Sequence, residues 1–142
     1  LSTGTFVSVG PLRARIIAAG DPCVQDVVVA GLNRDEIGIL IVPRLDACRA
    51  FAGLPHEAPA ADALAAAEVQ EFFQRLVDSQ WAAGTGSATR VARALVMVDP
   101  PSIDRGELTD KGSINQRAVL TQREALVENL YAGGEGVYLP QR

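Results

Sequence analysis

Several residue types are scarce in this sequence, and each scarcity argues against a class of protein. The 142 residues include one histidine and two cysteines, with no CxxC pair, so no set of metal ligands can be recognised. Acidic residues outnumber basic ones by 17 to 13, and the sequence pI of about 4.9 is unlike that of a nucleic-acid binder. No apolar run approaches the roughly 18–20 residues of a membrane-spanning helix. We therefore expect no bound metal, no nucleic acid and no membrane as partner.

Methionine occurs once, at position 97, and the first residues lack the basic and apolar regions of a signal peptide. We therefore expect this chain to be a piece of a longer protein, whose function also depends on residues outside it. Cys23 and Cys48 are expected to be reduced and buried, with one disulfide as the alternative. A cytoplasmic location follows from that expectation.

The remaining composition is that of a globular domain, with 48% hydrophobic and 21% charged residues and a mean hydropathy of +0.14. Apolar, β-branched runs predict strands at residues 24–30 and 37–42, joined by a loop of hairpin length. This hairpin should lie at the centre of a small sheet, covered on one or both faces. A third core strand is expected at 94–98 and a short N-terminal strand at 5–9.

Helices are predicted at residues 11–19, 45–52, 62–83 and 115–131. The helix at 62–83 carries one apolar stripe at helical spacing, which indicates core packing. Its members are Val69, Phe72, Phe73, Leu76 and Val77.

An irregular, solvent-facing loop is expected at 102–114, after the strand-ending Asp-Pro-Pro, and a tail at 133–142. The predicted fold class is therefore α+β, with helices packed on the faces of a small sheet and a short strand or hairpin at the N-terminus.

One residue stands out among the charges. Twelve of the 13 basic residues are arginines, and the single lysine is Lys111, within GELTDKGSINQR. It lies in a loop and is followed by Gly112, where the backbone can bend sharply. Its ammonium group could reach outward to a carboxylate or a phosphate. The alternative is an ordinary surface lysine paired with Asp110 or Glu107.

Three segments resemble the C-terminal domain of adenylate-forming acyl-CoA synthetases, and most of all that of feruloyl-CoA synthase. They read LSTGTFVSVGPLRARI (1–16), VQDVVVAGLNRDEIGILIVPR (24–44) and GELTDKGSINQRAVL (106–120). The wider superfamily commonly has Thr-x-Ser-Gly-Lys in the last segment. Here Ser113 takes the place of that lysine and Lys111 lies two positions earlier, so the resemblance assigns the catalytic role to Lys111.

The resemblance implies that residues 1–132 form the lid domain of an AMP-forming ligase and that 133–142 are a tail. Such enzymes join an acid to ATP, releasing pyrophosphate, and then pass the acyl group from the adenylate to coenzyme A. The lid rotates between two poses, and the N-terminal adenylation domain of the same chain holds most of the ATP, Mg²⁺ and acid sites. The acid would be aromatic, of the hydroxycinnamate type such as ferulate, and this domain would be inactive alone.

The resemblance also assigns roles to the N-terminal segment. Gly4, Thr5, Phe6 and Val7 would line the passage for coenzyme A, with simple strand packing as the alternative. Arg13 and Arg15 could meet the anionic parts of coenzyme A, although solvated surface arginines are the simpler interpretation. From a different class of function, the alternative for the whole chain is a non-catalytic α+β module that binds a small ligand or a protein.

Overall fold

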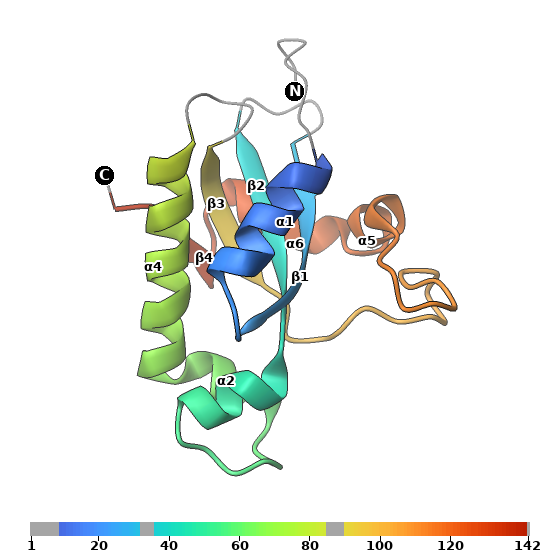
Figure 1. Ribbon diagram of the computed structural model, residues 1–142. Helices are drawn as coiled ribbons and strands as arrows, with labels where there is room; N and C mark the ends of the chain where they lie inside the picture. Colours follow the sequence, from blue (N-terminus) through green and yellow to red (C-terminus); the bar gives the residue numbers. More distant parts are fainter. Residues whose placement is uncertain (1–8, 32–35, 85–89, 142) are drawn as a thin grey trace.

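The computed structural model describes residues 9–31, 36–84 and 90–141 (Figure 1). Within them the order of elements is α1 (Val9–Ala19), β1 (Val24–Ala30), β2 (Ile37–Pro43), α2 (Leu45–Phe51), α3 (Ala60–Ala65), α4 (Ala67–Ala83), β3 (Val91–Val96), α5 (Gln116–Gln122), α6 (Glu124–Ala132) and β4 (Val137–Tyr138). The predicted α+β class is confirmed.

The four strands form one mixed sheet in the order β1-β2-β3-β4. β1 and β2 are the predicted antiparallel hairpin, with Val27 opposite Ile41. β3 runs parallel to β2, because α2, α3 and α4 carry the chain back to the start of the sheet between them. β4 adds two antiparallel residues on the outer side of β3.

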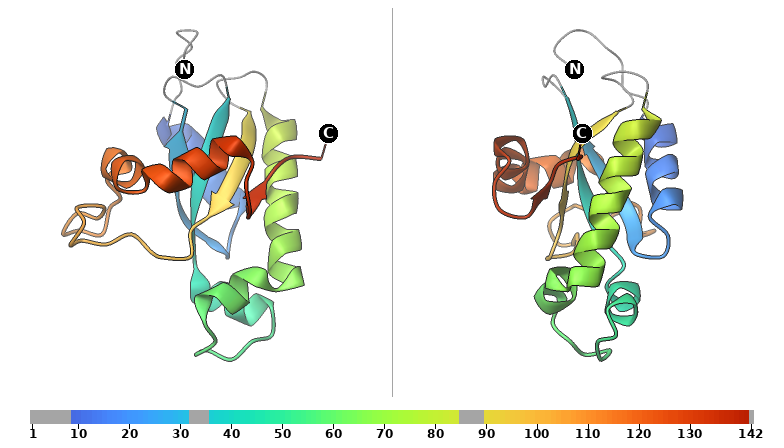
Figure 2. Two further views of the ribbon diagram at one scale, coloured as in Figure 1. Left: turned by 180° about the vertical axis from the view of Figure 1, so that it is seen from behind. Right: turned by 90° about the vertical axis from the view of Figure 1, so that its left-hand side faces the viewer.

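Both faces of the sheet are covered, since alternate side chains of each strand enter different layers. α1 and α4 lie on one face, and α5 and α6 lie on the other (Figure 2). The first layer buries Val27, Val29, Ile39 and Ile41 with Phe73 of α4. The second layer buries Val28, Ala30, Leu40 and Val42 with Leu130 of α6. This two-sided burial explains why the strands read as continuous apolar runs.

The structure corrects four of the predicted boundaries and positions. β1 lies at the edge of the sheet and not at its centre. The helix expected at 62–83 is two helices, because Ala66 has extended backbone angles (φ −62°, ψ 137°). The helix expected at 115–131 is likewise broken, at Arg123 (φ −115°, ψ 40°). The third strand begins earlier than expected, at Val91.

The two ends of the chain were also predicted incompletely. Residues 137–138, expected in a tail, form β4, and the ring of Tyr138 lies 6.2 Å from that of Phe73. Gln74 of α4 donates a hydrogen bond to the carbonyl of Leu139 (2.7 Å). The strand expected at 5–9 is wrong at Val9, which begins α1, and its other residues lie outside the described part of the chain.

Cys23 and Cys48 are free and buried, as expected. Burial is the main cause that raises the pKa of both thiols, that of Cys48 to about 12. None of the helices in the described residues combines the length and the apolar character needed to traverse a lipid bilayer.

Phe73→Ala should destabilise the chain by about 3–5 kcal/mol, because the ring is fully buried between α4 and the sheet and its loss leaves a cavity. Phe51→Ala is the matched control, since that ring is 44% exposed and should cost roughly 1 kcal/mol or less. Urea denaturation measures both free energies of unfolding. Equal losses in the two variants would contradict the assignment of the core.

Candidate active site

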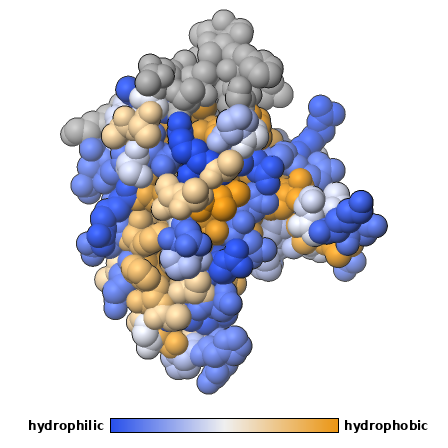
Figure 3. Space-filling model, viewed as in Figure 1, coloured by the Kyte–Doolittle hydropathy of each residue, from blue (hydrophilic) through white to orange (hydrophobic). Residues whose placement is uncertain are grey.

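The segment of residues 108–114, which contains Lys111, projects away from the sheet beside α5 (Figures 1 and 2). Leu108 and Ile114 form an isolated antiparallel bridge at its base. We call residues 108–114 the lysine hairpin. The outer end of this projection is hydrophilic on the face shown in Figure 3.

The tip of the lysine hairpin is a tight, hydrogen-bonded turn. The amide of Thr109 donates to the carbonyl of Ser113 (2.8 Å), and the amide of Gly112 donates to the carbonyl of Thr109 (2.9 Å). Gly112 has a φ of +82°, which fits a three-residue turn closed by a left-handed residue. Lys111 is therefore one of the central residues of a defined turn, and the glycine after it is required by the backbone.

Lys111 has no ion-pair partner among the described residues. The residue is exposed, and no carboxylate in the described part of the chain lies within salt-bridge distance of its ammonium group. The alternative of a pair with Glu107 is wrong, because that carboxylate faces inward. The ammonium group is free to meet a ligand outside this domain.

Glu107 lies directly before the lysine hairpin and is fully buried, although the loop around it was expected to face solvent. Its carboxylate accepts from Arg123 at both oxygens (2.7 and 3.1 Å) and from Nε of Arg105 (3.0 Å). The amide of Ser102 also donates to it (3.0 Å). We call Glu107, Arg105 and Arg123 the Glu107 cluster.

These contacts lower the pKa of Glu107 from its ordinary 4.5 to about 2. The hydrogen bonds from Arg123 are the largest cause, and those from Arg105 and Ser102 add to them, against the opposing effect of burial. Glu107 therefore stays ionised at neutral pH and holds its arginines as a charged group.

Two further side chains fix the far end of the lysine hairpin. The side-chain oxygen of Asn115 caps α5 by accepting from the backbone amide of Ala118 (3.1 Å). The backbone amide of Asn115 donates to the carbonyl of Glu107 (2.9 Å). Gln116 pairs with the free edge of β1, accepting from the amide of Val29 (2.9 Å) and donating to the carbonyl of Val27 (3.0 Å). The hairpin is thus tied to the sheet and to the loop before it.

The other predicted site residues are placed differently or not at all. Gly4, Thr5, Phe6 and Val7 lie outside the described residues. Arg13 pairs with Asp26 (2.6 Å), and Arg15 donates to Gln80 (2.7 Å). Both arginines are partly exposed, and each has a partner within the fold.

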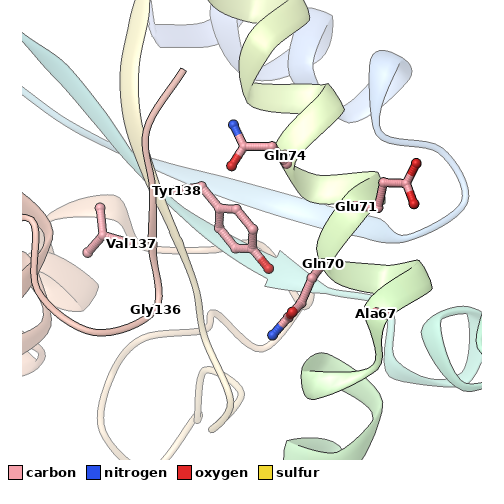
Figure 4. Close-up of a pocket in the computed structure, with 7 residues that line it drawn as sticks. All are labelled: Ala67, Gln70, Glu71, Gln74, Gly136, Val137 and Tyr138. Carbon is pink, nitrogen blue, oxygen red and sulfur yellow. The ribbon is translucent and has the colours of Figure 1, made fainter. Parts of the chain in front are cut away.

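Two cavities bear on the surroundings of the site. A cavity of about 400 Å³ separates the lysine hairpin, at Gly112 and Ile114, from the end of the sheet at Pro43. Another, of about 510 Å³, lies between α4 and β4 and is lined by polar side chains such as Gln70 (Figure 4). In the described residues no group of three or more His, Cys, Asp or Glu side chains could hold a metal ion.

Comparison with known proteins assigns the family. A model of the AMP-binding enzyme C-terminal domain matches residues 1–135. The chain belongs to this family. A search of curated proteins returned no match.

Solved structures share the fold. The A domain of carboxylic acid reductase from Segniliparus rugosus, in complex with AMP and a co-purified carboxylic acid, is 23% identical over 94% of this chain, with a TM-score of 0.58. The A-PCP didomain of the same organism's reductase is 23% identical over 94% (TM-score 0.59), and the adenylation domain of a carboxylate reductase from Mycobacterium chelonae is 22% identical over 93% (TM-score 0.59). The chain spans only 19%, 17% and 19% of the three structures.

The Glu107 cluster was not predicted, although the sequence held a signal for it. Arg123 lies on the apolar side of the predicted helix 115–131, in line with Val119, Leu126 and Leu130. A guanidinium on a buried stripe needs an acidic partner, because an unpaired buried charge is costly. The sequence could not show which of the acidic residues supplies it.

The Glu107 cluster should make stability depend on pH in the acid range. Between about pH 4.5 and about 2 the unfolded chain binds a proton at Glu107 that the folded chain does not, so the free energy of unfolding falls as the pH falls. Glu107→Gln should flatten this decline and cost roughly 1–3 kcal/mol at pH 7. Denaturation from pH 2 to 7 measures both effects. Glu124→Gln is the control, because Glu124 is exposed and its change leaves Glu107 intact; this variant should keep the steeper decline.

Proposed function

We propose that this chain is the C-terminal lid of an AMP-forming acid–thiol ligase, with Lys111 as the catalytic residue of adenylation. The observation that carries the proposal is the placement of Lys111, which is exposed at the tip of a hydrogen-bonded hairpin and has no carboxylate partner among the described residues. Membership of the AMP-binding C-terminal family supports it. The acid is proposed to be aromatic, of the hydroxycinnamate type, and the two free thiols suit the cytoplasm.

Lys111 would act where two anions must approach each other. In adenylation an oxygen of the substrate carboxylate attacks the α-phosphorus of ATP, the new C(O)O–P bond forms, and pyrophosphate leaves. The ammonium group would bridge the carboxylate and the α-phosphate oxygens and stabilise the charge of the transition state in a closed site. The N-terminal adenylation domain of the same chain would hold most of the ATP, Mg²⁺ and acid sites.

The second half-reaction would use another face of the lid. The thiol of coenzyme A attacks the acyl carbon of the adenylate, the thioester forms, and AMP leaves. Gly4, Thr5, Phe6 and Val7 are proposed to line the passage for the pantetheine arm, with no role for Lys111 in this step. A non-catalytic binding module remains the alternative function, and it requires no chemistry at Lys111.

Lys111→Ala in the full-length enzyme should slow acid-dependent pyrophosphate release about 100- to 1,000-fold, because one preorganised cation is lost from the transition state. Thioester formation from supplied acyl-adenylate should stay near the parent rate. Arg117→Ala removes an exposed cation from α5 and serves as the control.

Equal damage to both half-reactions by Lys111→Ala would contradict the proposed role of the lysine. An unchanged rate of pyrophosphate release would favour the non-catalytic module. Transfer of the acyl group to a carrier-protein thiol, but not to coenzyme A, would change the acceptor and leave adenylation by Lys111 in place.

Gly4→Leu should lower thioester formation by about tenfold or more while pyrophosphate release changes little, because a bulky side chain would narrow the proposed passage. Gly10→Leu is the matched control, since a Cβ at Gly10 meets open space. Rapid-quench assays of the two half-reactions measure the effect. A larger loss of pyrophosphate release than of thioester formation would rule out the passage.

A further inference from the structure

We propose that Arg123 and Glu107 are positioning residues that set the approach of Lys111 to the reacting groups. The inference rests on the proposed function of Lys111 and adds that these two residues orient its ammonium group. Neither residue is expected to touch the substrates, since Glu107 is fully buried and the Arg123 side chain is only 9% exposed.

Arg123 gathers three parts of the chain around one guanidinium group. It binds both carboxylate oxygens of Glu107, and it also donates to the carbonyls of Asp99 (2.6 Å) and Pro100 (2.9 Å). The start of the loop, the residue before the lysine hairpin and the junction of α5 with α6 are therefore joined at one point. The planar fork of arginine fixes direction as well as distance, which a lysine could not do.

Little apolar packing holds the hairpin, so its position also depends on this cluster. Between Asp99 and Ser113, Glu107 is the only fully buried residue. At the base of the hairpin, Ile114 is only partly buried against the second core layer, and a cavity of about 400 Å³ separates the hairpin from the end of the sheet. The position of the tip therefore depends more on hydrogen bonds than on apolar packing. These bonds are those of the Glu107 cluster and those of Asn115 and Gln116.

The same contacts reach both strands of the hairpin. The side chain of Glu107 binds Arg123 just before the first strand, and its carbonyl accepts from the amide of Asn115 just after the second (2.9 Å). Releasing Glu107 would loosen both ends, four residues from Lys111. The two core layers of the sheet contain none of these contacts, so the domain should remain folded.

The kinetic test uses the full-length enzyme with Arg123→Met, which keeps a long stem and removes the guanidinium. Pyrophosphate release should lose about 10- to 100-fold in kcat, with KM for ATP and acid little changed, because misplacement of the ammonium group affects the chemical step. Thioester formation from supplied acyl-adenylate should not change. Arg123→Lys should recover only part of the rate, and Arg117→Met, at an exposed position of α5, is the control.

The double variant Lys111→Ala/Arg123→Met distinguishes an effect through the position of Lys111 from a general loss of activity. If Arg123 acts through Lys111, adding Arg123→Met to Lys111→Ala should cause no further loss of adenylation. A further loss equal to that of Arg123→Met alone would overturn the proposal, and so would equal loss in both half-reactions.

A proteolysis experiment tests whether the Glu107 cluster holds the lysine hairpin, and it needs no measurement of enzyme activity. Lysyl endopeptidase can cut this 142-residue chain only after Lys111, its single lysine. Arg123→Met and Glu107→Gln should speed this cleavage about tenfold or more, since losing charged hydrogen bonds raises the population of the open hairpin. Arg117→Met should cut at the parent rate, and parental cleavage of the two cluster variants would overturn the proposal.

Failure of this inference and failure of the proposed function give different results. If Lys111→Ala leaves adenylation intact, the function proposed for the lysine is wrong whatever Arg123 does. If Lys111→Ala blocks adenylation while Arg123→Met adenylates at the parent rate, only the positioning role is wrong.

Discussion

The charged pair of Glu107 and Arg123 decides where the lysine hairpin lies. A carboxylate and a guanidinium removed from water are stable only when they meet with good geometry and when their remaining donors and acceptors are satisfied. Both conditions hold here, since Arg105, the amide of Ser102 and two backbone carbonyls complete the set. The pair therefore gives a long loop one defined attachment point.

Two kinds of interaction stabilise different parts of this domain. The sheet and its covering helices are held by apolar layers on both faces, and these layers need no charges to form. The hairpin outside them is held by directional hydrogen bonds, which transmit orientation better than apolar contact does. Such a division suits the proposed lid role, because a domain that moves as one body would have to carry the proposed catalytic lysine at a fixed place on that body.

Much of the fold could be predicted from sequence patterns, because strands and amphipathic helices have recognisable local patterns of apolar residues. The runs at 24–30 and 37–42 formed β1 and β2, and the stripe around Phe73 faced the core as expected. Helix breaks at Ala66 and Arg123 were missed, since neither residue is a strong helix breaker. In the structure Ala66 packs against the first core layer and Arg123 binds Glu107. β4 was missed because two residues carry no periodicity.

The sequence alone determined the class of the fold and the identity of the lysine, because composition, apolar periodicity and a single occurrence are properties of the chain itself. Only the tertiary structure decided that β1 is an edge strand, that Gln116 satisfies part of this edge and that Glu107 turns inward to Arg123. Sixteen positions separate Glu107 from Arg123, and they meet only after the sheet has brought their segments together. Local patterns cannot encode the choice of partner when several carboxylates compete for one guanidinium.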